Sequence, residues 1–137
     1  MNASRHRPWV RTTLLVGVVY LLIGRAFAVP TGNVRGWRLA AWLLSAAVYA
    51  AHVGHEHYWL RQPPRGTATH VAAAGALGAF GLAVAGVIYT LSTTHTLQMS
   101  WLLALFVLPL AIAVPAFIVA FLAASFLARL AATGDNG

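Results

Sequence analysis

Residues 70–89 read HVAAAGALGAFGLAVAGVIY, and this stretch decides the fold class. It contains no arginine, lysine, aspartate or glutamate, and its length matches the about 20 apolar residues that a membrane-spanning helix needs. Glycine and alanine recur in it every three or four residues, which lets neighbouring helices approach closely. The stretch therefore predicts a membrane helix that packs tightly against its neighbours.

Three further apolar runs surround this helix, and turn-forming segments such as PTGN at 30–33 and RQPPRG at 61–66 separate them. The chain is 60% hydrophobic and 8% charged, whereas a soluble domain carries charge on about a quarter of its residues. We therefore expect one domain, residues 1–137, that is an all-α integral membrane protein with four transmembrane helices in an up-down bundle. The predicted spans are about 12–29, 37–60, 70–91 and 100–130.

The loop arginines orient the predicted bundle. Cytoplasmic loops of membrane proteins carry an excess of basic residues, and arginine is the only basic residue type in this chain. The pattern therefore predicts that both termini are cytoplasmic (N-in and C-in) in a bacterial plasma (inner) membrane. It also predicts contacts with anionic lipids at the cytoplasmic face, and no binding of nucleic acid. The side assigned to the cytoplasm carries Arg5, Arg7, Arg11, Arg61, Arg65 and Arg129, against Arg35 and Arg38 on the other side.

Arg25 lies inside the first predicted span, about 6 Å from its outer end. Its side chain either reaches the outer headgroups along the helix or supplies a fixed positive charge to an outward cavity. The same first segment also imitates a signal peptide, because AFA at 26–28 resembles a cleavage site. Arg25 argues against cleavage, since it lies between the apolar region and that site.

A group of histidines and one acid at the end of the second span is the candidate functional site. His52, His55 and Glu56 share one helix face by their spacing of three and four residues. The loop that follows is short, so His70 at the start of the third span is expected on the same cytoplasmic side. Three imidazoles and a carboxylate are a plausible ligand set for a transition metal. Two histidines on adjacent helices could instead ligate a haem, or the group could relay protons without a cofactor. Interfacial anchoring at a helix end is the fourth alternative.

A second set of residues on the third span indicates packing. The set consists of small residues on one side of the helix: Gly75, Gly78, Ala79 and Ala83. These residues predict close contact with neighbouring helices of the same chain or, alternatively, a face for a second copy.

No catalytic residues can be assigned from the sequence. Cysteine is absent, and the only acids are Glu56 and Asp135. The leading hypothesis is a small membrane protein that acts as a non-enzymatic accessory or assembly subunit with a homo-oligomeric or membrane-protein partner. One alternative is a metal- or haem-binding membrane protein that uses the cytoplasmic-side His/Glu group. Another is a proton-coupled transporter or channel that acts as an oligomer.

Overall fold

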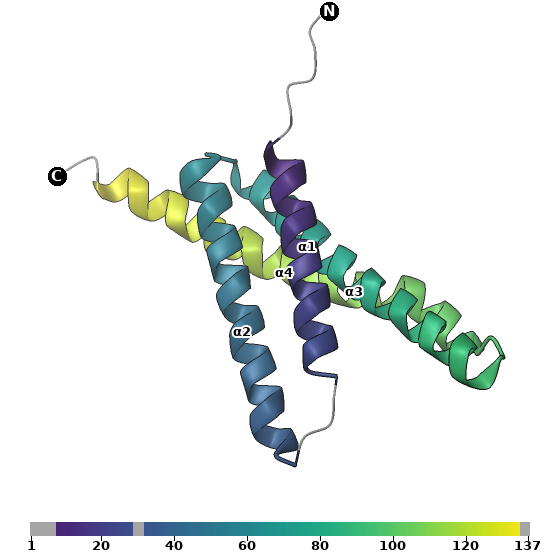
Figure 1. Cartoon of the computed structure of the whole chain (residues 1–137). Coiled ribbons are helices and arrows are strands. Elements are labelled where there is room, and N and C mark those ends of the chain that lie inside the picture. The colour runs from purple at the N-terminus through teal and green to yellow at the C-terminus, as the bar shows by residue number, and fades with distance from the viewer. Residues whose placement is uncertain (1–7, 29–31, 135–137) are drawn as a thin grey trace, which may run out of the picture.

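The computed structural model of this chain describes residues 8–28 and 32–134, and these are helical almost throughout. Four α-helices and one short π-helix follow one another along the chain (Figure 1). In a π-helix the backbone hydrogen bonds join residues five apart, which widens the turn. The elements are α1 (Pro8–Ala26), α2 (Val34–Gly54), the π-helix η1 (His55–Trp59), α3 (Pro64–Thr94) and α4 (Met99–Gly134).

Local sequence signals explain where several of these helices begin and end. The Asn33 side chain accepts a hydrogen bond from the backbone N–H of Gly36 at 2.9 Å, which caps the start of α2. Pro64 occupies the first position of α3, where its missing N–H leaves no hydrogen bond unmade. At the other end of α3, His95 adopts a left-handed conformation with φ 54° and stops the helix.

Helices α3 and α4 form an antiparallel pair. Gly75 faces Ile112 of α4, while Gly86, near the far end of α3, faces Trp101 at the start of α4. Helix α1 lies across α3 in the same direction: Gly17 meets Leu77 and Gly24 meets Leu82. Figure 1 shows α1 and α2 crossing the α3–α4 pair at a steep angle. This differs from the four near-parallel helices that an up-down bundle predicts.

Helix α2 has the least contact with the rest of the chain. Its clearest tie to α4 is the hydroxyl of Tyr49, which donates a hydrogen bond to the backbone carbonyl of Ala116 at 2.6 Å. Large apolar side chains on α2 are open to the surroundings, with Trp42 73% and Leu43 71% exposed. The chain itself therefore covers little of this helix.

Three helices are long and apolar enough to cross a membrane: Trp9–Ala26, Pro64–Thr94 and Met99–Thr133. The prediction of a helical membrane protein is confirmed to that extent. Helix α2, the second predicted span, is not apolar enough among the described helices, because Arg35, Arg38 and His52 lower its hydropathy. The boundaries also differ from the prediction, since α2 ends at Gly54 and α3 already begins at Pro64.

Candidate functional site

The candidate site lies at the junction between η1 and α3. The π-turn ends with the N–H of Leu60 bonded to the carbonyl of His55 at 3.3 Å, and the N–H of Gln62 bonds to the carbonyl of Glu56 at 3.2 Å. Arg61 takes a left-handed φ of 47°, which reverses the chain within this short link. The start of α3 is therefore held close to the end of η1.

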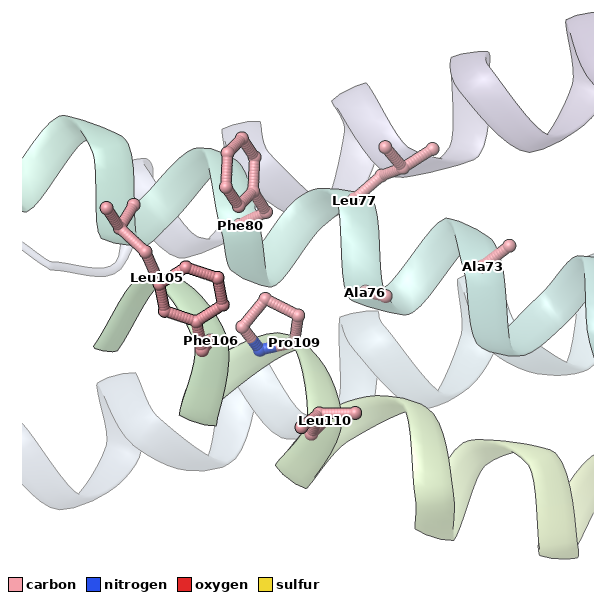
Figure 2. Close-up of a pocket in the computed structure, with 8 residues that line it drawn as sticks. All are labelled: Ala73, Ala76, Leu77, Phe80, Leu105, Phe106, Pro109 and Leu110. Carbon is pink, nitrogen blue, oxygen red and sulfur yellow. The ribbon is translucent and has the colours of Figure 1, made fainter. Parts of the chain in front are cut away.

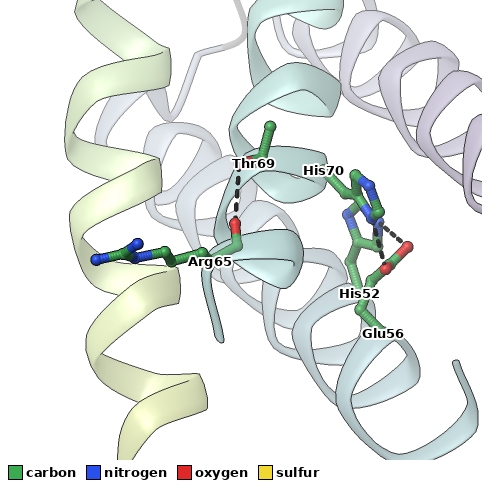
Figure 3. A network of polar contacts seen from close by, with 5 residues as sticks. All are labelled: His52, Glu56, Arg65, Thr69 and His70. Atoms are coloured by element: carbon green, nitrogen blue, oxygen red, sulfur yellow. Dashed lines mark hydrogen bonds and ion pairs between the residues drawn. The ribbon is translucent and has the colours of Figure 1, made fainter. Parts of the chain in front are cut away.

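Glu56 is the centre of the site and is fully buried, with 0% of its surface exposed. The Nδ1 atom of His70 lies 2.8 Å from Oε2 of Glu56, so an N–H at that nitrogen donates to the carboxylate (Figure 3). The Nε2 atom of His52 lies 3.7 Å from Oε1, which is an ion-pair distance and too long for a hydrogen bond. One carboxylate therefore faces two imidazoles that come from two different helices.

The ring of Trp9 covers this His–Glu–His network from α1. It stacks on the imidazole of His70 with ring centroids 4.4 Å apart and an interplanar angle of 2°. Trp9 lies just before the first predicted span, on the side assigned to the cytoplasm, but nothing in the sequence pairs it with His70. The sequence indicates only that both residues lie at the same depth in the membrane. Which face of α1 meets α3 is determined by the contacts of Gly17 and Gly24.

His55 is the candidate ligand that the structure does not bring into the network. Its side chain is exposed and stacks on Trp59 at a centroid distance of 6.1 Å. Among the described residues, no three or more histidine or acidic side chains are arranged to hold a metal ion. The Nδ1 atom of His70 is instead hydrogen-bonded to the carboxylate of Glu56. Metal or haem binding stays a prediction, which an absorption spectrum and elemental analysis of the purified protein would check.

Several polar atoms near the network have no hydrogen-bond partner within the described part of the chain. They include both ring nitrogens of His52, Oε1 of Glu56 and the hydroxyl of Thr67, a fully buried residue in the first turn of α3. A buried polar atom without a partner costs about 1–3 kcal/mol, and internal water commonly satisfies such groups. The junction between η1 and α3 therefore contains a small group of buried polar atoms whose hydrogen-bonding capacity the described residues do not fill.

The remaining sequence-predicted residues lie away from this network. Arg25 is exposed in the last turn of α1, a placement that suits a side chain reaching the headgroups. Gly75, Gly78, Ala79 and Ala83 are all buried in α3. Gly78 faces Tyr20 of α1, so the chain itself occupies this part of the small-residue side.

An apolar groove lies between α3 and α4 (Figure 2). It measures about 640 Å³, and its walls come from the two candidate membrane spans of α3 and α4. The walls are formed by Ala73, Ala76, Leu77, Phe80, Leu105, Phe106, Pro109 and Leu110. No polar side chain among them could orient a substrate, so the groove suits acyl chains or another apolar helix. Comparison of the chain with protein-family models, curated proteins and solved structures finds no match.

Proposed function

We propose that all four helices cross the inner membrane of a bacterium and that both termini are cytoplasmic. Support comes from the common direction of α1 and α3 where they cross, since Gly17 meets Leu77 and Gly24 meets Leu82. The end of α1 and the start of α3 therefore lie at opposite ends of the molecule. Only α2 connects them, so α2 has to return across the same thickness. The arginine distribution gives the direction.

The function proposed for this chain is that of a non-enzymatic accessory or assembly subunit, and α2 is the observation that carries it. Helix α2 is not among the helices apolar enough to span a membrane: it carries Arg35 and Arg38 in its first turns and His52 near its end, so lipid on all sides suits it poorly. Its own chain covers it little, and Trp42 and Leu43 point away from the other helices with most of their surface open. A second copy or a membrane-protein partner that packs on this face would stabilise α2 in the bilayer.

Crosslinking tests this proposal, because the chain lacks cysteine and a single one can be introduced anywhere. We expect Leu43→Cys, labelled with a thiol-attached photo-crosslinker in native membranes, to give one discrete adduct of higher mass. Val107→Cys on α4 is the matched control, since Val107 is 58% exposed in a candidate span. The same adduct from both positions, or none from Leu43→Cys, would contradict a specific partner on α2.

The second candidate function is proton handling, and the polar groups on successive turns favour it. His52 lies one helical turn before Glu56, and Tyr49 lies nearly one turn before His52. Tyr20 of α1 has a buried hydroxyl for which the described residues offer no hydrogen-bond partner. Ionisable side chains inside membrane proteins commonly mark proton pathways. This series would lead from the cytoplasmic end toward the membrane centre in an oligomeric channel or proton-coupled transporter.

Proton flux into liposomes that contain the purified protein tests this second candidate. We expect Glu56→Gln to lower the flux by at least about tenfold, because the amide cannot exchange the proton that the carboxylate carries. His55→Gln is the matched control, since His55 lies outside the network, and its flux should stay at the original level. Two results would remove proton transport from consideration. One is an unchanged flux in Glu56→Gln, and the other is a flux with the original protein that is no higher than in protein-free liposomes.

A further inference from the structure

We propose that Arg11, Arg61 and Arg65 form a binding surface for the phosphate headgroups of anionic phospholipids. This proposal rests on the membrane orientation proposed above and adds a specific partner to it. The three arginines come from α1, from the link after η1 and from the first turn of α3. All three are exposed. They share one end of the molecule, because Trp9, two residues before Arg11, stacks on His70 of the first turns of α3.

The chain offers these guanidinium groups no neutralising carboxylate within the residues that the structure describes. Glu56 is the only acid in ranges 8–28 and 32–134, and it is fully buried between His52 and His70. Within the described ranges the positive charge of this end has no internal counter-charge, and a bound anion would neutralise it. Arginine is suited to phosphate, because its planar guanidinium donates paired hydrogen bonds to two oxygens.

Aromatic side chains at the same end favour a lipid headgroup over a soluble anion. Tyr58 is 64% and Trp59 is 81% exposed, three and two residues before Arg61. Tyrosine and tryptophan concentrate at the depth of the headgroups, where the ring meets acyl chains and the polar edge meets water. Exposed aromatic rings beside exposed arginines are the combination that a phospholipid, with an apolar tail and an anionic head, complements.

The orientation of Arg65 separates this surface from the buried network. Figure 3 shows the Arg65 side chain pointing away from Glu56 and His70, toward the ribbon of α4. Its backbone carbonyl accepts a hydrogen bond from the hydroxyl of Thr69 at 2.8 Å, and its guanidinium has no ion-pair partner among the residues that the structure describes. Changes at this arginine should therefore affect lipid binding without disturbing the His–Glu–His network.

Native mass spectrometry of the purified protein in a neutral detergent tests the proposal. We expect phosphatidylglycerol to remain bound where phosphatidylcholine does not. The double variant Arg61→Gln/Arg65→Gln should weaken phosphatidylglycerol binding by about tenfold or more. Arg35→Gln/Arg38→Gln is the matched control, because it removes the same charge from exposed positions at the start of α2 and should retain binding. Arg11→Gln, on a separate helix, gives a second reading should the double variant fold poorly.

Three outcomes would overturn the proposal. Equal loss in the two double variants would mean that total charge alone attracts the lipid. Equal binding of phosphatidylglycerol and phosphatidylcholine would remove the headgroup specificity. Displacement of the bound lipid by inorganic phosphate at matched concentration would indicate a site for free phosphate instead. None of these results depends on whether α2 has a protein partner, so failure here and failure of the accessory function are distinguishable.

Discussion

Replacing Glu56 by alanine is expected to lower the free energy of unfolding by about 3–5 kcal/mol, the cost typical of breaking a buried charged pair. The carboxylate is fully buried, and its removal leaves His52 and His70 facing a cavity. Neither imidazole could then find a new hydrogen-bond partner, such as water, without opening the junction between η1 and α3. Titration of the protein from a mild detergent into sodium dodecyl sulfate, followed by circular dichroism, would measure the change.

The comparison with His55→Ala isolates the effect of the network. His55 lies one residue away but is exposed, so its removal should change the free energy of unfolding by less than about 0.5 kcal/mol.

A double-mutant cycle between Glu56→Gln and His70→Gln should give a coupling of about 1 kcal/mol or more, because their side chains meet at 2.8 Å. Similar losses for Glu56→Ala and His55→Ala would show that the network contributes little.

The meeting of His52, Glu56 and His70 follows from patterns that the sequence carries. A spacing of four residues places His52 and Glu56 on one helix face, and this relation survives into the π-turn. The link RQPP is too short to let the next helix begin elsewhere, so His70 arrives beside them. Spacing and loop length are local properties, and local properties are what a single sequence expresses directly.

His55 and Trp9 could not be placed in the same way. The spacing from His52 predicts a shared face for both His55 and Glu56, but three residues turn a helix by about 300° and four by about 400°. His55 and Glu56 therefore lie on opposite sides of His52, and it is Glu56 that faces His70. The stacking of Trp9 on His70 depends on how α1 is rotated against α3. Contacts between Gly17 and Leu77 and between Gly24 and Leu82 set this rotation. Each contact pairs residues about 60 positions apart, which helical periodicity does not register.

Helix α2 is the predicted span for which the hydropathy of the sequence was a poor guide to the helix that forms. Its apolar run was sufficient to predict a span, yet the helix that forms starts early enough to include Arg35 and is not apolar enough among the described helices to count as one. Hydropathy scores a helix as if lipid surrounded it on every side. A helix that neighbours shelter can tolerate charge that lipid would not. A low hydropathy is what a helix with the partner proposed above would show.

Gly78→Leu is expected to destabilise the chain by about 3 kcal/mol or more, at the upper end of the cost of overpacking. A Cβ atom at position 78 would lie 2.6 Å from Cβ of Tyr20 and 3.2 Å from the backbone carbonyl oxygen of Gly17. Neither neighbour can move as the tip of a flexible side chain could. The helices α1 and α3 would have to separate, and thermal unfolding in detergent should report the loss.

Gly54→Leu is the matched control for this prediction, because a Cβ at position 54 meets no atom within 4 Å. It should leave the free energy of unfolding within about 0.5 kcal/mol of the original. The comparison also decides between the two uses of the small-residue side of α3. Internal packing predicts that Gly78→Leu lowers stability at every protein concentration. A face for a second copy predicts instead that the monomer keeps its stability while self-association is lost. Because Tyr20 and Gly17 already occupy the space beside Gly78, the contacts within one chain favour the first result.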